Sequence, residues 1–189
     1  SFSKNKFLTA LIAAGDWTLR NQRENGHYEI RINAMTVEES QAQELGRSVL
    51  AAYSLLRLYE VTRDEAYIES ARKNLAFFDT NLRFITTHAP ALPIPAPSLT
   101  FRVLSGIELA RITRDKRYFE EVRPLLRHLI SLYDEKKITA LSTPESDRDP
   151  AFIADQATIY DNQALMVLAL AAQETGEKSL TFQVLSIAN

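Results

Sequence analysis

Apolar residues recur at helical spacing along most of this chain, and the pattern predicts an all-helical protein. The first predicted helix covers residues 4–23, and its apolar stripe comprises Phe7, Leu8, Leu11, Ile12 and Ala14. The pair Asn25–Gly26 is expected to end this helix, because glycine commonly terminates helices. Residues 27–32 then alternate apolar and polar positions, which predicts a short extended segment.

The following helices are of two kinds. The segment 39–61 is apolar on almost every side from Val49 onward, so we expect a helix buried on most sides. The segment 64–82 carries a single apolar stripe, which predicts an outer helix that covers an inner one. That stripe comprises Tyr67, Ala71, Leu75, Phe78 and Leu82.

The contrast between inner and outer helices recurs in the second half of the chain. Residues 103–112 and 161–174 are expected to form inner helices, and 118–133 and 180–187 their outer partners. Pro124 falls inside the outer segment 118–133, where it is expected to kink the helix or to start its main body. Seven helices are predicted in total.

Three similar turns divide these helices into hairpins. Thr62-Arg63-Asp64 returns as Thr113-Arg114-Asp115 and, more loosely, as Thr175-Gly176-Glu177, so the spacings are 51 and 62 residues. A period near fifty residues is typical of stacked helical hairpins, each unable to bury its apolar face alone. We therefore expect one domain over residues 1–189, an array of α/α hairpins that forms a partial (α/α) toroid of about seven helices.

Two long connections interrupt the predicted array. Residues 83–100 hold Pro90, Pro93, Pro95 and Pro97, which favours an extended polyproline-like crossing. Residues 138–158 are polar and rich in serine, threonine, aspartate and proline, and long loops of this kind are often functional.

Composition narrows the possible partners. The net charge is −2, from 22 basic and 24 acidic residues with no basic block, so we expect neither nucleic acid nor a membrane as a partner. The absence of cysteine excludes disulfides and thiolate chemistry and favours the periplasm or the cell exterior. Neither the histidines nor the glycines have the spacing of a metal site or a phosphate loop, so we expect no metal and no cofactor.

The connections that precede the inner helices are expected to meet at one end of the array. Helix N-termini favour anionic or hydroxyl-rich ligands, so this end is the predicted site. Three segments lead to it: 25–47, 95–102 and 149–162. They supply candidate site residues Tyr28, Glu29, Arg31, Glu44, Arg47, Arg102, Asp155, Tyr160, Asp161 and Asn162.

Several of these residues also have a purely structural interpretation. Glu44 and Arg47 have the spacing of a surface ion pair on one helix. Asp161 is placed to cap the N-terminus of the helix expected at 161–174. Arg102 either completes an anion site or is solvated.

Three stretches of the chain resemble a known superfamily. Residues 14–28, with Trp17, Gln22 and Asn25-Gly26, resemble a unit of the α/α-toroid, or six-hairpin, glycosyl enzymes. Residues 46–53 and 67–71 resemble the repeat of N-acylglucosamine 2-epimerase and glucuronyl C5-epimerase relatives, and 159–165 are similar to a Tyr-Asp-Asn-Ala motif of that superfamily. The resemblance implies an inner-ring cavity in which Arg47 contacts a sugar.

The chain departs from this superfamily in two respects. The paired catalytic histidines of the epimerases are missing, and those enzymes are about twice as long. We therefore expect a ring that is open, that a second copy or another chain completes, or that continues in a longer chain.

Two functions follow from these observations. The first is a carbohydrate-active protein that acts on a polysaccharide or a uronic-acid-containing glycan as a hydrolase, lyase or epimerase. Hydrolysis would use Glu29 or Glu44 with Asp155 or Asp161, whereas a lyase or epimerase would use Tyr28 or Tyr160 as proton carrier and Arg47 to hold the sugar. The lyase or epimerase is preferred to the hydrolase, because tyrosine and arginine are better represented than carboxylates in the three segments.

The alternative function is a non-catalytic helical-repeat module that binds a glycan or a protein in its concave face. This alternative predicts a shallow groove and no residue with a strongly perturbed proton affinity. An enzyme would instead show a deep cavity with an acidic or tyrosine pair within hydrogen-bond reach.

Overall fold

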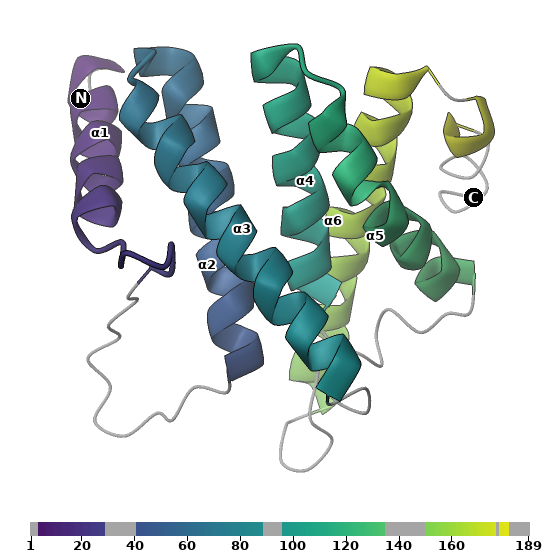
Figure 1. Cartoon of the computed structure of the whole chain (residues 1–189). Helices are drawn as coiled ribbons and strands as arrows, with labels where there is room; N and C mark the ends of the chain where they lie inside the picture. The colour runs from purple at the N-terminus through teal and green to yellow at the C-terminus, as the bar shows by residue number, and fades with distance from the viewer. Residues whose placement is uncertain (1–3, 29–40, 89–95, 135–149, 177, 182–189) are drawn as a thin grey trace. The chain divides into compact units, whose positions relative to one another are not determined.

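The computed structural model describes residues 4–28, 41–88, 96–134, 150–176 and 178–181, all of them helical apart from short turns (Figure 1). The chain divides into two compact units, residues 1–92 and residues 93–189. Each unit is described by itself. The first unit contains α1 (Lys4–Arg20), α2 (Gln41–Thr62) and α3 (Glu65–His88); the second contains α4 (Ala96–Thr113), α5 (Arg117–Asp134) and α6 (Pro150–Thr175). The predicted all-helical class is confirmed, while the toroid and the single domain stay predictions.

Each unit is built on one helical hairpin. In the first unit α2 packs along α3, and α1 contacts both helices. In the second unit α4 packs along α5 on one side and α6 on another. Outside the helices, the described residues contain one isolated antiparallel β-bridge, between Gln22 and Tyr28.

The turns within the two hairpins have the same geometry. The hydroxyl of Thr62 donates to Leu58 O at 2.9 Å, and the hydroxyl of Thr113 donates to Leu109 O at 2.6 Å. The next residue is left-handed in both turns, with φ of 61° at Arg63 and 57° at Arg114. A residue in this conformation just past the helix end is a common way to stop a helix.

The aspartate that follows begins the second helix of each hairpin. Asp64 Oδ1 accepts from the backbone N–H of Ala66, and Asp115 Oδ1 accepts from that of Arg117, both at 3.0 Å. These bonds satisfy a backbone donor at each helix N-terminus, which is the usual role of an N-cap aspartate.

The third copy of the turn repeats the first half of this geometry. Thr175 donates its hydroxyl to Ala171 O at 2.7 Å, and Gly176 takes the left-handed conformation with φ of 65°. Residues 178–181 are helical again after it. The repeat that the sequence predicts is therefore confirmed as a repeat of backbone structure.

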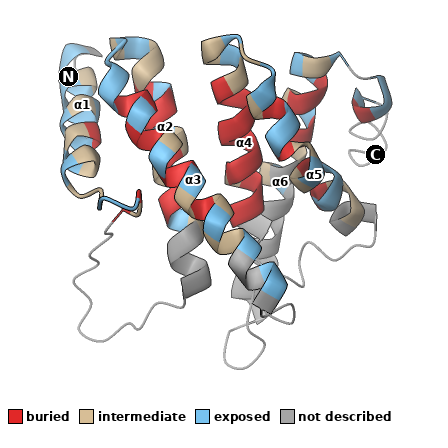
Figure 2. Ribbon diagram, viewed as in Figure 1, coloured by how far each residue is buried: buried red, intermediate tan, exposed pale blue. Residues whose placement is uncertain are grey.

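The expected contrast between inner and outer helices holds for the second hairpin. Almost every residue of α4 from Ser98 to Leu109 is buried (Figure 2), whereas α5 buries one stripe. That stripe comprises Phe119, Val122, Leu126 and Leu129. From Val49 onward, α2 is buried or half-buried on most sides, as expected. One face is exposed, on which Leu50 is 41% and Val61 63% exposed, together with Ser54 and Arg57.

Both long connections are shorter than predicted. Helix α3 continues to His88 and α4 begins at Ala96, so residues 83–88 and 96–100 are helical, and 89–95 lie outside the described residues. Pro97 lies in the first turn of α4 and Pro150 is the first residue of α6, positions where proline loses no helical hydrogen bond. Residues 150–158 are consequently helical and not loop.

Helix α5 runs as one helix through Pro124, so this residue does not start it. The last predicted helix, 180–187, is described only to residue 181.

Candidate functional site

Tyr28 follows a tight turn that folds back onto α3. Gly26, with φ of 94°, donates its N–H to Arg23 O at 2.9 Å, and Arg23 donates to His27 O at 2.8 Å. The carbonyl of Gly26 accepts the side-chain amide of Asn74 at 2.9 Å. The turn is thereby held against α3 by specific hydrogen bonds.

The hydroxyl of Tyr28 lies inside this contact. Ser70 donates its proton to Gln22 Oε1 at 2.9 Å, so Tyr28 Oη, 2.9 Å from Ser70 Oγ, is the donor in their bond. Gln22 in turn donates to Ser70 O at 2.8 Å. Tyr28 is 2% exposed, and burial raises the pKa of its phenol, so it is held protonated.

A hydrogen bond from a second tyrosine, Tyr67, joins α3 to α1. The hydroxyl of Tyr67 donates to Asp16 Oδ1 at 2.6 Å. Burial, reinforced by the Asp16 carboxylate, raises the pKa of Tyr67 to about 12. A general acid or base works best with a pKa near neutrality, and both tyrosines are shifted away from it. The role of Tyr28 as proton carrier stays a prediction.

The remaining candidates of the first unit are only partly described. Arg47 lies in the second turn of α2 and is exposed. Glu44 belongs to the first turn of the same helix, but its side chain is outside the description, and Glu29 and Arg31 lie outside the described residues. Their proposed contacts stay predictions.

In the second unit, residues 150–158 of the segment expected to be a loop lie in the first half of α6, and 138–149 lie outside the described residues. Asp155, Tyr160 and Asp161 lie within this helix, with side chains outside the description, and Asn162 is exposed. The N-cap interpretation of Asp161 is wrong, because α6 already begins at Pro150. Asp161 therefore has helical residues on both sides.

Arg102 is buried in α4, with 3% of its surface exposed. Its Nη2 atom lies 3.8 Å from Oε2 of Glu121 on α5. The interpretation of Arg102 as a solvated side chain is therefore wrong. Arg102 belongs to the second unit and Tyr28 and Arg47 to the first, so the structure describes no common site for them.

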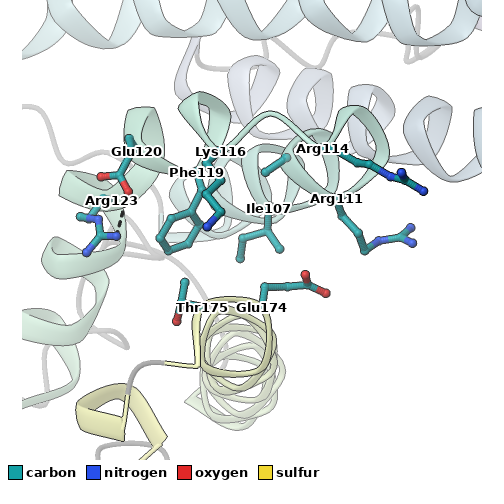
Figure 3. A pocket seen from close by; sticks show the side chains of 10 residues that line it. Ile107, Arg111, Arg114, Lys116, Phe119, Glu120, Arg123, Glu174 and Thr175 are labelled. Carbon is teal, nitrogen blue, oxygen red and sulfur yellow. Dashed lines mark hydrogen bonds and ion pairs between the residues drawn. The ribbon is translucent and has the colours of Figure 1, made fainter.

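A groove of about 450 Å³ lies within the second unit, between the ends of three helices (Figure 3). It is placed at the C-terminal ends of α4 and α6 and the N-terminal end of α5. The lining residues are Ile107, Ala110, Arg111, Arg114, Lys116, Phe119, Glu120, Arg123, Glu174 and Thr175. Ile107, Ala110 and Phe119 are its apolar members, and most of the others carry charge, four of them positive and two negative.

The charged side chains of the groove differ in their partners. Arg123 pairs with Glu120 at 2.9 Å, and Arg111 pairs with Glu108 at 2.7 Å. Arg114 and Lys116 are exposed and make no ion pair with any residue in the described part of the chain. Arg111, Arg114 and Glu174 extend toward the same side of the groove, and Phe119 and Lys116 lie over its middle (Figure 3).

This groove was not among the sequence-based candidates. The predicted site lies at the N-terminal ends of the inner helices, whereas the groove lies at the C-terminal end of α4. The signal was nevertheless present, since Arg114 belongs to the second copy of the repeated turn and Arg111 and Lys116 lie beside it in sequence.

Comparison with protein-family models, curated proteins and solved structures finds no match to this chain. The resemblance to α/α-toroid glycosyl enzymes therefore stays a prediction. Among the residues that the structure describes, no cluster of acidic and histidine side chains is arranged to hold a metal ion. No helix in the described ranges is both long and apolar enough to cross a bilayer.

Proposed function

We propose that this chain is a non-catalytic helical-hairpin module that binds a glycan in the groove of its second unit. One observation carries the proposal: an open groove of about 450 Å³ is lined by three apolar side chains, four arginine or lysine side chains and two glutamates. Sugar hydroxyls accept hydrogen bonds from guanidinium groups, and four cationic side chains line the groove.

Two tyrosines have strongly raised pKa values, which a binding module alone does not predict, but neither of them lines the groove. Burial raises the pKa of Tyr28 and of Tyr67, the latter to about 12, so neither is prepared to exchange a proton near neutral pH. In the groove, the carboxylate of Glu120 is held by Arg123.

The first hairpin offers a variant that tests this proposal. Ala110 lines the groove, and the residue 51 positions earlier is Tyr59, whose hydroxyl donates to Glu65 at 3.1 Å. The substitution Ala110→Tyr should therefore fill the groove with a side chain that this position accommodates in the other hairpin. Tyr59→Ala is the matched control, because it changes the same position outside the groove.

The experiment is calorimetric titration of neutral and uronic-acid oligosaccharides into wild type and both variants. We expect at least one oligosaccharide to bind wild type, about tenfold weaker binding by Ala110→Tyr, and unchanged binding by Tyr59→Ala. Failure of every oligosaccharide to bind wild type would reject the proposal. Product formation from any bound oligosaccharide would show that the carbohydrate-active enzyme is the correct alternative, and Arg47→Ala would then test its predicted sugar contact.

A further inference from the structure

We infer that Asn25 is a site of spontaneous covalent modification, and that the turn around it sets how fast the modification occurs. The pair Asn25-Gly26 is the one asparagine–glycine dipeptide of the chain. Asparagine is among the chemically labile residues of proteins, and a following glycine leaves the backbone nitrogen sterically open because it has no Cβ. This site is independent of the groove, which lies in the other unit.

The modification is deamidation through a cyclic imide. The backbone nitrogen of Gly26 loses its proton to hydroxide and attacks Cγ of Asn25, and a new C–N bond forms. The bond from Cγ to the side-chain nitrogen breaks, and this nitrogen takes a proton from water and leaves as ammonia. Water then opens the imide at one of its two carbonyls, which gives either aspartate or isoaspartate. In isoaspartate the main chain continues through Cγ and is therefore one carbon atom longer.

Two hydrogen bonds of the closed turn oppose this attack. Gly26 donates its N–H to Arg23 O at 2.9 Å, so the nitrogen that must attack is engaged. Asn25 Oδ1 accepts from the backbone N–H of His27 at 3.0 Å, which fixes the orientation of the side-chain amide. Both bonds must break before the nitrogen of Gly26 can reach Cγ of Asn25.

Contacts with buried and half-buried side chains keep the turn closed. The carbonyl of Gly26 accepts from Asn74 Nδ2 at 2.9 Å and from Gln22 Nε2 at 3.0 Å. Asn74 is buried and Gln22 is half-buried, whereas Asn25 is exposed. Water and hydroxide therefore have access to Asn25, and the reaction waits only for the turn to open. Such local opening depends on the contacts of the segment that opens and does not require unfolding of the whole unit.

The isoaspartate product does not fit the closed turn. Gly26 lies so close to α3 that a Cβ on it would be 2.3 Å from Lys73 O. One more carbon atom in the adjacent main chain shifts the carbonyl of Gly26 away from its two donors. Aspartate instead keeps the length of the main chain and an oxygen that accepts from His27. We therefore expect isoaspartate to hold the turn open and to expose Tyr28, which is 2% exposed in the closed turn.

Variants separate opening of the turn from unfolding of the unit. Asn74→Ala removes one donor from Gly26 O. Gln22→Ala removes the other donor from a half-buried position, so it serves if Asn74→Ala does not fold. Tyr67→Phe is the matched control, because it removes a hydrogen bond to Asp16 in the same unit and leaves both donors to Gly26 O in place.

The experiment incubates each protein at mildly alkaline pH, with and without denaturing urea, and follows Asn25 by mass spectrometry of the digested chain. We expect Asn25 of wild type to deamidate at least about tenfold more slowly in the folded protein than in urea. Asn74→Ala or Gln22→Ala should react about tenfold faster than folded wild type, whereas Tyr67→Phe should stay within about twofold of it. Asn162, which is exposed and followed by glutamine, is the internal control and should react more slowly than Asn25 in urea.

The opposite results would overturn the inference. Equal rates in folded wild type and in urea would show that the turn does not protect Asn25. Equal acceleration by Asn74→Ala and Tyr67→Phe would show that unfolding of the unit controls the reaction. An unmodified Asn25 in urea would exclude the site altogether.

Incubated protein tests the fate of the product. Ion exchange separates deamidated from intact protein, because deamidation adds one negative charge. We expect the fraction that contains isoaspartate to unfold at a temperature at least about 5 °C below that of wild type, and Asn25→Asp to unfold within about 2 °C of wild type. An equal loss in Asn25→Asp would attribute the effect to the added charge and contradict the misfit of isoaspartate.

Discussion

The hydroxyl of Tyr67 on α3 donates a hydrogen bond of 2.6 Å to Oδ1 of Asp16 on α1. The bond forms beside Gly15, where an added Cβ would lie 2.2 Å from Leu58 Cδ2 and 3.0 Å from the Tyr67 ring. Helix α1 therefore approaches the α2–α3 hairpin closely at this point, and the Asp16–Tyr67 bond fixes its position along α3.

Removal of this bond should destabilise the first unit. We expect Tyr67→Phe to lower the free energy of unfolding by about 1–2 kcal/mol, because it deletes a hydrogen bond to a charged acceptor. Asp16→Asn should cost less, since an amide oxygen still accepts the phenol proton. Urea unfolding followed by circular dichroism measures both changes, and wild-type stability in Tyr67→Phe would contradict the expectation.

Alkaline pH should weaken the fold through the same tyrosine. The pKa of Tyr67 is about 12 in the folded protein against 10 ordinarily, so the folded state holds this proton more tightly than the unfolded state. Its stabilising contribution is complete below pH 10 and is lost as the pH rises from 10 to 12. Burial of Tyr28 acts in the same direction.

We therefore expect the free energy of unfolding to fall over this pH range, and to fall less in the double variant Tyr28→Phe/Tyr67→Phe. Chemical unfolding at a series of alkaline pH values tests this, with phenolate absorbance reporting the titration. If the free energy of unfolding falls equally steeply with pH in wild type and in the double variant, groups other than these tyrosines cause the loss of stability.

Two left-handed glycines should respond very differently to alanine. At Gly26, with φ of 94°, an added Cβ would lie 2.3 Å from Lys73 O, whereas at Gly176, with φ of 65°, it would meet no atom within 4 Å. Gly26→Ala should therefore cost at least about 2 kcal/mol through both conformation and collision with α3, and Gly176→Ala about 1 kcal/mol through conformation alone. Comparable losses measured by thermal unfolding would show that the collision is relieved.

Gly106 on α4 sets the distance to α5. An added Cβ would lie 2.5 Å from Val122 Cγ1 and 3.0 Å from Tyr118 O. We expect Gly106→Ala and Val122→Ala each to cost about 1–3 kcal/mol, by overpacking and by an emptied site respectively. The double variant should cost at least about 1 kcal/mol less than the sum of the two, because the deleted methyl groups make space for the new one.

The first hairpin provides the rationale for this double-mutant cycle. At the equivalent positions it has Leu55 and Ala71, so a large residue lies on the first helix and a small one on the second. The second hairpin has the reverse order with Gly106 and Val122. Strict additivity of the two single substitutions would show that Gly106 and Val122 do not share one packing site.

The amino-acid sequence by itself determined the helices, their turns and the repeat. A helix and its caps depend on contacts within about four residues, such as Thr62 with Leu58 or Asp115 with Arg117, so local sequence is sufficient to predict them. Proline was the local signal that misled, because Pro97 and Pro150 lie in helix first turns, where proline is tolerated, and not in extended chain.

Only the tertiary structure decided which side chains are available for chemistry. Tyr28 is enclosed by Gln22 and Ser70, and Arg102 is buried beside Glu121, by contacts with residues up to 42 positions away in sequence. The groove likewise forms because Arg111 of α4, Phe119 of α5 and Glu174 of α6 meet where three helix ends converge. Burial and pocket shape depend on such long-range packing, and a pattern of nearby residues does not contain it.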